Sequence, residues 1–249
     1  MAQLRPLQVR TRSGSTIGVL EAGAGDRVVF AIGGMSVRSF AESAMRLVLE
    51  DAADRGARCV LMDIAGSGAS TSGASLTMDT WLADVEEVFE ERVGKPAIWT
   101  GASLGAWLML LAHRRDPRRF LSMCALAPAF DWDQQYVGPR LADGRLAVAG
   151  GTVANSDGTA LASRELLISM APHHVLRAPF VLDAPLHVIA GVRDEIAPAA
   201  GARRFIESAR GAVCTGEFLP EGDHGVAKLD PPLAMLRYLA WLRSALDAG

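Results

Sequence analysis

One serine, Ser103, lies between two apolar runs in the segment GASLG, residues 101–105. The run before it, residues 96–101, is predicted to be a strand, and the run after it, residues 104–115, a helix. A residue that joins a strand directly to a helix occupies a strained turn, and only small neighbours fit two positions to either side. This pattern is typical of a nucleophilic serine held out over the end of a sheet, although a helix N-cap would also explain the serine.

A nucleophilic serine needs a general base, and His224 is placed to serve as one. It lies in the glycine-flanked loop between the last predicted strand, residues 212–220, and the last predicted helix, residues 231–246. From there its ring can reach the carboxyl ends of parallel strands, although a surface-loop histidine is the alternative. The other histidines lie within predicted strands or helices or near the end of an irregular segment, where structural roles are expected: His113, His173, His174 and His187.

The carboxylate that would orient His224 is predicted to be Asp194. It comes directly after the predicted strand of residues 185–191, in a tight turn at the same edge of the sheet. There its carboxylate can accept a hydrogen bond from the ring nitrogen that faces away from the serine. Four other carboxylates near strand ends stay as alternatives: Asp131, Asp133, Glu195 and Asp223.

Acyl transfer also needs two N–H donors where negative charge develops on the carbonyl oxygen. The backbone of Leu104, immediately after the serine, is predicted to supply one of them. The other is expected from Met35, which follows Gly33 and Gly34 after the predicted strand of residues 27–33. The two glycines let the backbone approach closely, so Gly34 is also expected to line the substrate site, although a tight turn alone would explain them.

Strands and helices alternate along most of the chain, which predicts an α/β fold with a mostly parallel sheet and helices on both faces. Further strands are expected over residues 8–14, 16–22, 58–64 and 120–128, and further helices over residues 39–56, 77–92 and 198–211.

The alternation stops over residues 129–183, a stretch too long for a bare loop, so we expect a small cap insertion within a single domain of residues 1–249. Several side chains in or near this insertion are candidates for an apolar substrate pocket, and ordinary packing explains them equally well: Phe130, Trp132, Tyr136 and Met170.

Composition excludes several classes of protein. The net charge is −3 and charges of both signs are scattered, so a nucleic-acid or anionic-membrane surface is not expected. No apolar run approaches the ~20 residues of a membrane span, and we expect no secretion signal. Three cysteines without a CxxC pairing indicate reduced thiols and a cytoplasmic location.

No motif indicates a cofactor or a metal. The segment DIAGSGAST from Asp63 lacks the Gly-Lys-Ser/Thr of a phosphate-binding loop, and EAGAGD lacks the spacing of a dinucleotide fingerprint. There is no H-E-x-x-H sequence and no clustered set of histidine and aspartate. We therefore expect no cofactor, no metal, and a small-molecule substrate bound by a monomer or homodimer.

With these residues assembled, the chain resembles the α/β-hydrolase superfamily. Within it, the chain is similar to a mitochondrial serine esterase subgroup known for palmitoyl-protein thioesterase and acyl-glucuronide esterase activity, and to its bacterial relatives. The segments that carry the resemblance are GASLGAWLML (101–110), HHVL (173–176) leading to GVRDEIAP (191–198), GDH (222–224) and DIAGSGAS (63–70).

The resemblance implies that Ser103, Asp194 and His224 are nucleophile, acid and base, and that carboxylic esters or thioesters are cleaved through an acyl-enzyme. Gly33 departs from the family, where many relatives have His or Pro, and residues 129–183 match poorly. Other serine chemistry, namely amide or carbon–carbon hydrolysis or perhydrolysis, and a non-catalytic ligand-binding role are the alternatives.

Overall fold

The computed structural model describes residues 2–36, 38–40, 43–73, 75–230 and 232–248. An eight-stranded sheet with the order β1-β2-β4-β3-β5-β6-β11-β13 lies at its centre. The first two strands run antiparallel to their neighbours and the other six are parallel to one another, which agrees with the mostly parallel sheet that the sequence predicts. The strands are β1 (Arg5–Arg10), β2 (Thr16–Ala22), β3 (Val28–Ile32), β4 (Arg58–Met62), β5 (Ala97–Ala102), β6 (Phe120–Leu126), β11 (Leu186–Gly191) and β13 (Cys214–Leu219).

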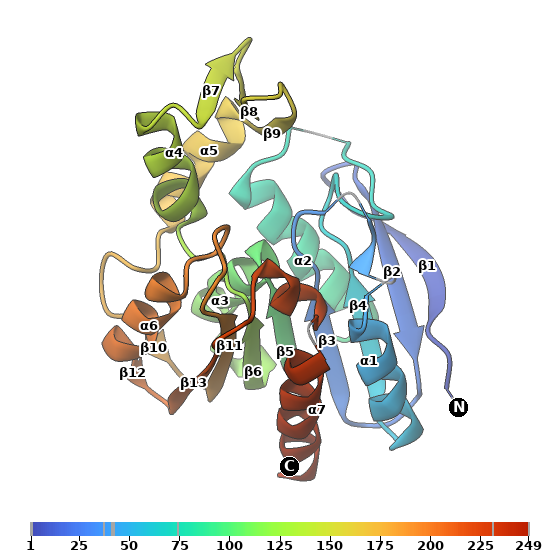
Figure 1. Ribbon diagram of the computed structural model, residues 1–249. Helices are drawn as coiled ribbons and strands as arrows, with labels where there is room; N and C mark the ends of the chain where they lie inside the picture. The colour runs from blue at the N-terminus through green and yellow to red at the C-terminus, as the bar shows by residue number, and fades with distance from the viewer. Residues whose placement is uncertain (1, 37, 41–42, 74, 231, 249) are drawn as a thin grey trace.

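Helices cover both faces of this sheet (Figure 1). Side chains of the parallel strands alternate between two apolar clusters, one shared with α1 and α7 and the other with α2, α3 and α6. Because both faces are covered, the central strand β5 is buried along its whole length. The helices are α1 (Met45–Asp54), α2 (Met78–Arg92), α3 (Leu104–Arg115), α6 (Ala199–Ser208) and α7 (Pro232–Asp247).

Two predicted boundaries were wrong. The first strand ends at Arg10 rather than at residue 14, because Thr11 and Gly14 form a hydrogen-bonded turn instead of continuing the ladder. The first helix begins at Met45 rather than near residue 39. Residues 41–42 of that predicted helix, and residue 231 of the last one, lie outside the described residues.

The insertion, residues 129–183, contains short regular elements that the sequence pattern did not resolve, and it stands above the sheet in Figure 1. Three of its strands form a small antiparallel sheet. Its last strand pairs with the two-residue β12 (Arg210–Gly211). The elements are η3 (Asp133–Val137), α4 (Gly138–Ala142), β7 (Leu146–Ala149), β8 (Thr152–Asn155), β9 (Ala160–Ser163), α5 (Arg164–Met170), η4 (Ala171–His173) and β10 (Val181–Leu182).

The two ends of the insertion are joined by Asp131. This residue has a left-handed backbone with φ of 47°, and its carboxylate is buried. One carboxylate oxygen accepts a hydrogen bond from the Val175 N–H at 2.7 Å and the other from the Leu176 N–H at 3.1 Å. Burial raises the pKa of Asp131, an effect that these two hydrogen bonds oppose.

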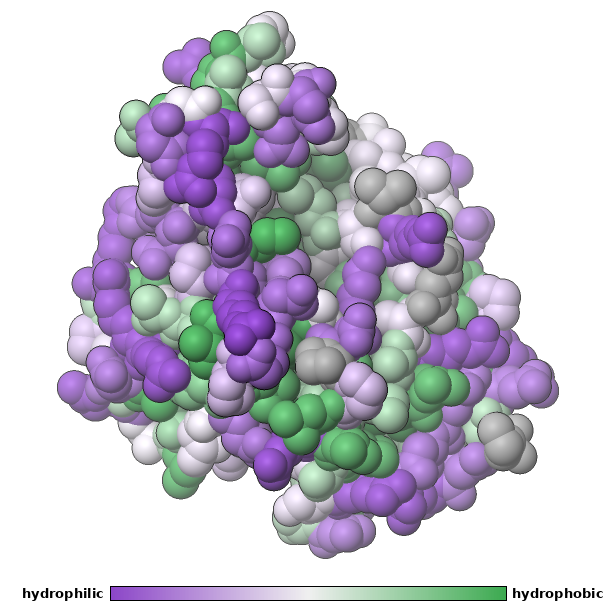
Figure 2. All heavy atoms as spheres, viewed as in Figure 1, coloured by the Kyte–Doolittle hydropathy of each residue, from purple (hydrophilic) through white to green (hydrophobic). Residues whose placement is uncertain are grey.

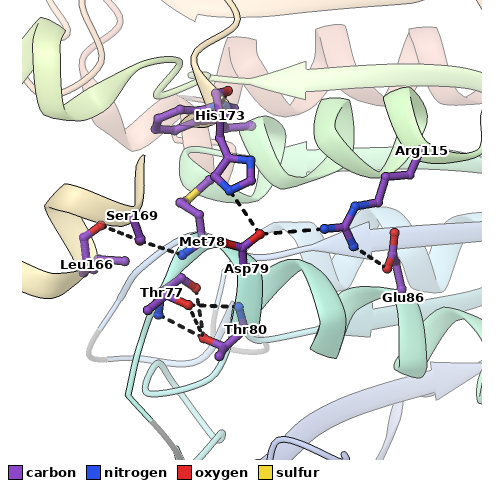
Figure 3. Close-up of polar contacts among 10 residues, drawn as sticks. Thr77, Met78, Asp79, Thr80, Glu86, Arg115, Leu166, Ser169 and His173 are labelled. Atoms are coloured by element: carbon purple, nitrogen blue, oxygen red, sulfur yellow. Dashed lines mark hydrogen bonds and ion pairs between the residues drawn. The ribbon is translucent and has the colours of Figure 1, made fainter. Parts of the chain in front are cut away.

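A second set of polar contacts attaches the insertion to the start of α2 (Figure 3). Ser169 of α5 accepts a hydrogen bond from the Met78 N–H at 2.9 Å. The ring of His173 lies 3.2 Å from the Asp79 carboxylate, which also faces Arg115 at 3.8 Å. Thr77 caps the helix, so its first turn is a fixed platform for these contacts.

Candidate active site

Ser103 is the single residue between the end of β5 and the start of α3. Its backbone has φ of 53° and ψ of −120°, a strained conformation for a residue with a side chain. The strain is held by its neighbours: the Ser103 N–H donates to the Leu126 carbonyl at 2.9 Å, and the Ser103 carbonyl accepts from the Ala129 N–H at 3.2 Å. The hydroxyl therefore projects at the carboxyl end of the sheet.

The two glycines that flank this turn have no room for a side chain. A Cβ on Gly101 would lie 2.5 Å from the Gly105 carbonyl oxygen, and a Cβ on Gly105 would lie 2.5 Å from the Ile32 carbonyl oxygen. Real Cβ atoms do not approach backbone this closely, so the G-x-S-x-G spacing follows from packing of the turn against itself and against β3.

Ser103, His224 and Asp194 form a continuous series of hydrogen bonds. The Ser103 Oγ lies 3.1 Å from His224 Nε2, and His224 Nδ1 lies 2.7 Å from Asp194 Oδ2. The other carboxylate oxygen accepts from the Ile196 and Ala197 N–H groups at 2.9 and 2.7 Å. The Asp194 side chain has no exposed surface, whereas the His224 side chain is 24% exposed. The imidazole is thus fixed from the buried side and open on the other.

The loops that carry the acid and the base are packed backbone to backbone. The Arg193 N–H donates to the Gly222 carbonyl at 2.9 Å, and Gly191 lies so close to Gly222 that a Cβ would overlap its carbonyl oxygen. His224 then begins η5 (His224–Lys228), a short 3₁₀ helix capped by the Asp223 side chain. Because β11 and β13 are adjacent and parallel, both loops leave the sheet at the same edge.

The two predicted oxyanion donors lie in segments that adjoin Ser103. Gly34 is pressed against the serine, since a Cβ there would lie 2.7 Å from the Ser103 Cβ. Leu104 is the first residue of α3, so its N–H has no partner within the helix. Within the part of the chain that the structure describes, neither the Met35 nor the Leu104 N–H donates a hydrogen bond to another protein group.

The other histidines lie away from Ser103. His113 is buried beside Phe120, and its Nε2 accepts the Asp183 N–H at 3.2 Å. His187 bonds Thr215 on the neighbouring strand at 2.8 Å. Burial lowers the pKa of both His113 and His187. His173 lies 3.2 Å from Asp79 of α2, and His174 lies 2.8 Å from Asp133 within the insertion.

The alternative carboxylates also have other partners. Asp133 contacts His174 at 2.8 Å rather than His224. Glu195 has an exposed side chain, and its carbonyl accepts a hydrogen bond from Arg140 at 3.0 Å. Asp223 accepts the Gly225 N–H at 2.8 Å and does not turn back onto the adjacent histidine ring.

The residues predicted to line a substrate pocket separate into two groups. Phe130, Trp132 and Met170 are buried and packed in the main apolar cluster. Tyr136 is only partly buried, stacks on Trp132 with ring centroids 5.4 Å apart, and lines a cavity of about 480 Å³. The first group packs in the core, and its predicted role in lining a substrate pocket stays a prediction.

The cavity lies between the insertion and the loop that follows Asp194. Glu195 and Ile196 form its wall on that side, and Arg140 and Leu146 belong to the opposite wall. The Arg140 guanidinium lies 3.9 Å from the centre of the Tyr136 ring and donates to the Glu195 carbonyl, so it joins the two walls. Figure 2 shows a hollow below the insertion with apolar atoms in its floor.

Three further properties bear on chemistry. Among the described residues, no group of three or more His, Cys, Asp and Glu is arranged to hold a metal ion. The described helices include none that is both long and apolar enough to cross a membrane. Cys59, Cys124 and Cys214 are free thiols, and burial raises the pKa of Cys59 to about 12 and of Cys214 to about 11.

The chain is similar to proteins of a known family. Residues 26–165, more than half of the chain, match the family described as "Serine aminopeptidase, S33". The chain belongs to this α/β-hydrolase family. It is also similar to the mitochondrial palmitoyl-protein thioesterase ABHD10 of Homo sapiens, 27% identical over 150 residues, which are 57% of this chain and 49% of the relative. The Mus musculus protein of the same name is 26% identical over 146 residues, 56% of this chain and 49% of the relative.

The chain thus spans about half the length of the curated relatives it matches. Two solved structures share its fold with a TM-score of 0.78. A protein from Agrobacterium vitis S4 is 22% identical and covers 98% of this chain and 99% of its own. Mouse α/β hydrolase domain-containing protein 10 is 18% identical with the same coverage. These findings confirm the predicted fold class and the predicted resemblance.

Sequence reasoning missed two residues that support the site. Lys228 donates a hydrogen bond to the Ser36 hydroxyl at 3.0 Å, which links η5 to the loop that carries Met35. The only signal available in the sequence was that Lys228 follows His224 by four residues, one helical turn away.

Proposed function

We propose that this protein is a serine hydrolase that cleaves carboxylic esters or thioesters through an acyl-enzyme intermediate. The observation that carries the proposal is the hydrogen-bonded series from Asp194 through His224 to the Ser103 hydroxyl, with distances of 2.7 and 3.1 Å. Such a series makes a serine nucleophilic at neutral pH, where its own hydroxyl is not ionised. Membership of an α/β-hydrolase family supports it independently.

In the first half of the reaction Ser103 Oγ attacks the carbonyl carbon of the substrate while His224 Nε2 takes the hydroxyl proton. The carbonyl oxygen becomes an oxyanion and accepts hydrogen bonds from the Met35 and Leu104 N–H groups, each worth about 3 kcal/mol of barrier. The tetrahedral intermediate then collapses. Its bond to the alcohol or thiol breaks, and the leaving group takes the proton from His224.

In the second half a water molecule replaces the leaving group. His224 removes one proton from the water as its oxygen attacks the acyl carbon, and the same two N–H groups hold the second oxyanion. When this intermediate collapses, Ser103 recovers its proton from His224 and the carboxylic acid leaves. Asp194 keeps the imidazole in one orientation and stabilises its positive charge in both halves.

The start of α3 contributes to the same oxyanion. Unpaired N–H groups at a helix N-terminus carry partial positive charge, and Leu104 is the first residue of the helix. This position stabilises an anion on the substrate more than the neutral carbonyl it comes from. The effect therefore favours the transition state over the ground state, as catalysis requires.

The cavity beside Tyr136 is the place where we propose that part of the substrate binds. It lies next to the loop of Asp194. Leu146 and Ile196 form apolar parts of its wall, and Arg140 adds a positive charge. The relatives named as palmitoyl-protein thioesterases support an acyl ester or thioester substrate rather than an amide. A cytoplasmic location is part of this proposal and rests on three free cysteines; fractionation of cells would test it.

Steady-state and pre-steady-state kinetics test this function. We expect hydrolysis of activated acyl esters and thioesters with a burst of the first product equal to the enzyme concentration, because an activated ester should acylate Ser103 faster than water removes the acyl group. The Ser103→Ala variant should lose the burst. Ser122→Ala is the matched control, since its hydroxyl lies on the neighbouring strand β6 and has no partner among the described residues.

Two outcomes would favour the alternatives. Cleavage of amides or carbon–carbon bonds in preference to esters would place the protein among other serine hydrolases. Binding of an ester without turnover, unchanged in Ser103→Ala, would indicate a ligand-binding protein and overturn the proposal.

A further inference from the structure

The loop that carries Met35 is fixed on both sides of that residue. Gly34, on one side, is pressed against the Ser103 Cβ. Ser36, on the other side, uses all three of its polar groups. Its N–H donates to Ser67 Oγ at 3.3 Å, its carbonyl accepts the Gly68 N–H at 2.8 Å, and its hydroxyl accepts a hydrogen bond from Lys228 Nζ at 3.0 Å.

Two of these three hydrogen bonds come from the loop after β4. That loop is itself held by Asp63, a buried carboxylate that accepts the Phe40 and Ala69 N–H groups, each at 3.0 Å. A Cβ on Gly68 would lie 2.7 Å from the Ser39 Cα, so this loop is in close contact with the loop that carries Met35. The DIAGSGAS segment thus holds one side of the loop of Met35 through the sheet edge rather than through the helix of His224.

The third hydrogen bond comes from the helix that carries the general base. Lys228 is the last residue of η5 and His224 is the first. The helix is one short turn closed by hydrogen bonds from the Leu229 N–H to the Val226 carbonyl and from the Asp230 N–H to the Gly225 carbonyl, each 3.0 Å. Lys228 and His224 thus lie at the two ends of one short hydrogen-bonded segment.

The ammonium of Lys228 is directed at this loop by more than one contact. It lies 5.7 Å from the centre of the buried Phe40 ring, within range of a cation–π interaction. Over the described residues no carboxylate forms an ion pair with Lys228, so its charge is not taken up elsewhere. The ammonium has the Ser36 hydroxyl as its hydrogen-bond acceptor.

From this geometry we infer that Lys228 is a positioning residue for catalysis. It joins the helix of His224 to the loop of the Met35 N–H, and so keeps the general base and the oxyanion donor in a fixed relative position. The inference rests on the proposed function, since it assigns Lys228 a role in that same site. Misplacement of a catalytic group by about 1 Å costs on the order of 100-fold in rate, so a link of this kind has a measurable effect.

Replacement of Lys228 by methionine tests the inference, because methionine keeps most of the apolar length and removes the ammonium. We expect kcat for a neutral acyl ester to fall by about 10- to 100-fold with KM changed less than threefold. The rate of phosphonylation of Ser103 by a fluorophosphonate should fall in proportion, since that reaction uses the same base and the same N–H donors. Lys228→Arg keeps a donor and should recover most of the activity.

Two comparisons make the test specific. Lys95→Met is the matched control: it removes the other lysine of the chain, an exposed residue that pairs with Asp26 at 3.5 Å, and it should behave as wild type. Ser36→Ala removes the acceptor and should lower kcat to the level of Lys228→Met, with no further loss in the double variant. If the Lys228→Met protein fails to fold, Ser36→Ala still tests the inference.

Wild-type kcat in both Lys228→Met and Ser36→Ala would overturn the inference. So would a rise in KM confined to esters that bear a carboxylate, because Lys228 would then bind substrate directly. A fall in kcat matched by an equal fall in the folded fraction, with no separate effect on the phosphonylation rate, would reduce Lys228 to a structural residue. Failure of the proposed function is distinct: the wild-type protein itself would neither hydrolyse esters nor be labelled at Ser103.

Discussion

Two aspartate–histidine pairs of nearly equal length occur in this chain. Asp194 lies 2.7 Å from His224 at the edge of the sheet, and Asp133 lies 2.8 Å from His174 in the insertion. Both histidines are in contact with a carboxylate that would stabilise a protonated ring. The two pairs differ in what the second ring nitrogen faces.

The second nitrogen of His224 faces the Ser103 hydroxyl, whereas that of His174 faces no acceptor in the part of the chain that the structure describes. His224 Nε2 lies 3.1 Å from Ser103 Oγ, and its ring is partly open to solvent. His174 Nδ1 is buried and has no hydrogen-bond partner among the described residues, and the ring stacks near Trp107 instead. An aspartate–histidine pair is thus a candidate for catalysis only when the second ring nitrogen contacts a nucleophile and the ring is accessible to a substrate.

The two carboxylates are also held differently. Asp194 receives two backbone N–H groups on the oxygen that does not contact histidine. Asp133 directs both of its oxygens at the His174 ring, at 2.8 and 2.9 Å. Backbone donors leave the Asp194–His224 pair little freedom, as a preorganised site requires, while the Asp133–His174 pair joins two parts of the insertion to each other.

The largest difference between the pairs should follow from removal of each carboxylate charge. We expect Asp194→Asn to lower kcat by about 10⁴-fold, because the amide no longer holds the ring in the orientation that accepts the serine proton. Asp133→Asn should change kcat less than threefold and lower the free energy of unfolding by about 1–3 kcal/mol. Ester hydrolysis and urea denaturation measure both. Equal losses of activity in the two variants would contradict the assignment of only the Asp194–His224 pair to catalysis.

Glycine substitutions should separate the same two regions. Gly34→Ala places a Cβ 2.7 Å from the Ser103 Cβ, so the loop must move and kcat should fall by about 10²- to 10³-fold, the loss typical of a missing oxyanion donor. Gly138, the first residue of α4, has a helical φ of −55°. Gly138→Ala should leave kcat unchanged and alter the free energy of unfolding by no more than about 1 kcal/mol. Activity lost through Gly138→Ala would show that the insertion controls the nucleophile.

The stem of the insertion should affect stability rather than catalysis. Asp131→Ala leaves the buried Val175 and Leu176 N–H groups without acceptors, and the free energy of unfolding should fall by about 2–3 kcal/mol. Asp143→Ala is the control, because this exposed carboxylate pairs with the exposed Arg145 nearby, and no change in stability is expected. Calorimetry would measure both. A stable Asp131→Ala protein with impaired kcat would contradict this division.

The smallest expected effect is a change in the pH dependence of stability at His113, beside the end of the insertion. Burial lowers the pKa of this histidine below the usual 6.5, although Asp183 opposes the shift. As the pH falls through the usual value, the unfolded chain takes up a proton that the folded protein refuses, so the stabilising contribution of the neutral ring is lost at acidic pH.

His113→Gln keeps an acceptor for the Asp183 N–H but does not titrate. Its free energy of unfolding should decline less steeply than that of the wild type as the pH is lowered from 7 to 5. Parallel pH curves for the two proteins would show that His113 takes up its proton equally in both states.

The positions of the central residues could be predicted because they depend on the sheet. Ser103, Asp194 and His224 each follow a parallel strand, and parallel strands end at a common edge. The glycines around Ser103 could be predicted for a similar reason, since the turn itself leaves no space for a Cβ. Local sequence patterns therefore predict the position of a site residue when the backbone alone determines the geometry.

Features that depend on side chains from distant segments could not be predicted. Trp132 and Met170 are apolar in either role, and only the packing shows that they are buried. The contact between Lys228 and Ser36 joins residues 192 positions apart, and no periodicity marks it. The short strands β7 to β9 lack the length that would give a recognisable alternation.

Covalent labelling at Ser103 tests the central claim most directly. A fluorophosphonate should add one phosphonyl group per molecule, mass spectrometry should locate it on the peptide that contains Ser103, and Ser103→Ala should take up none. A label on another residue, or undiminished labelling of Ser103→Ala, would contradict the assignment of Ser103 as the nucleophile.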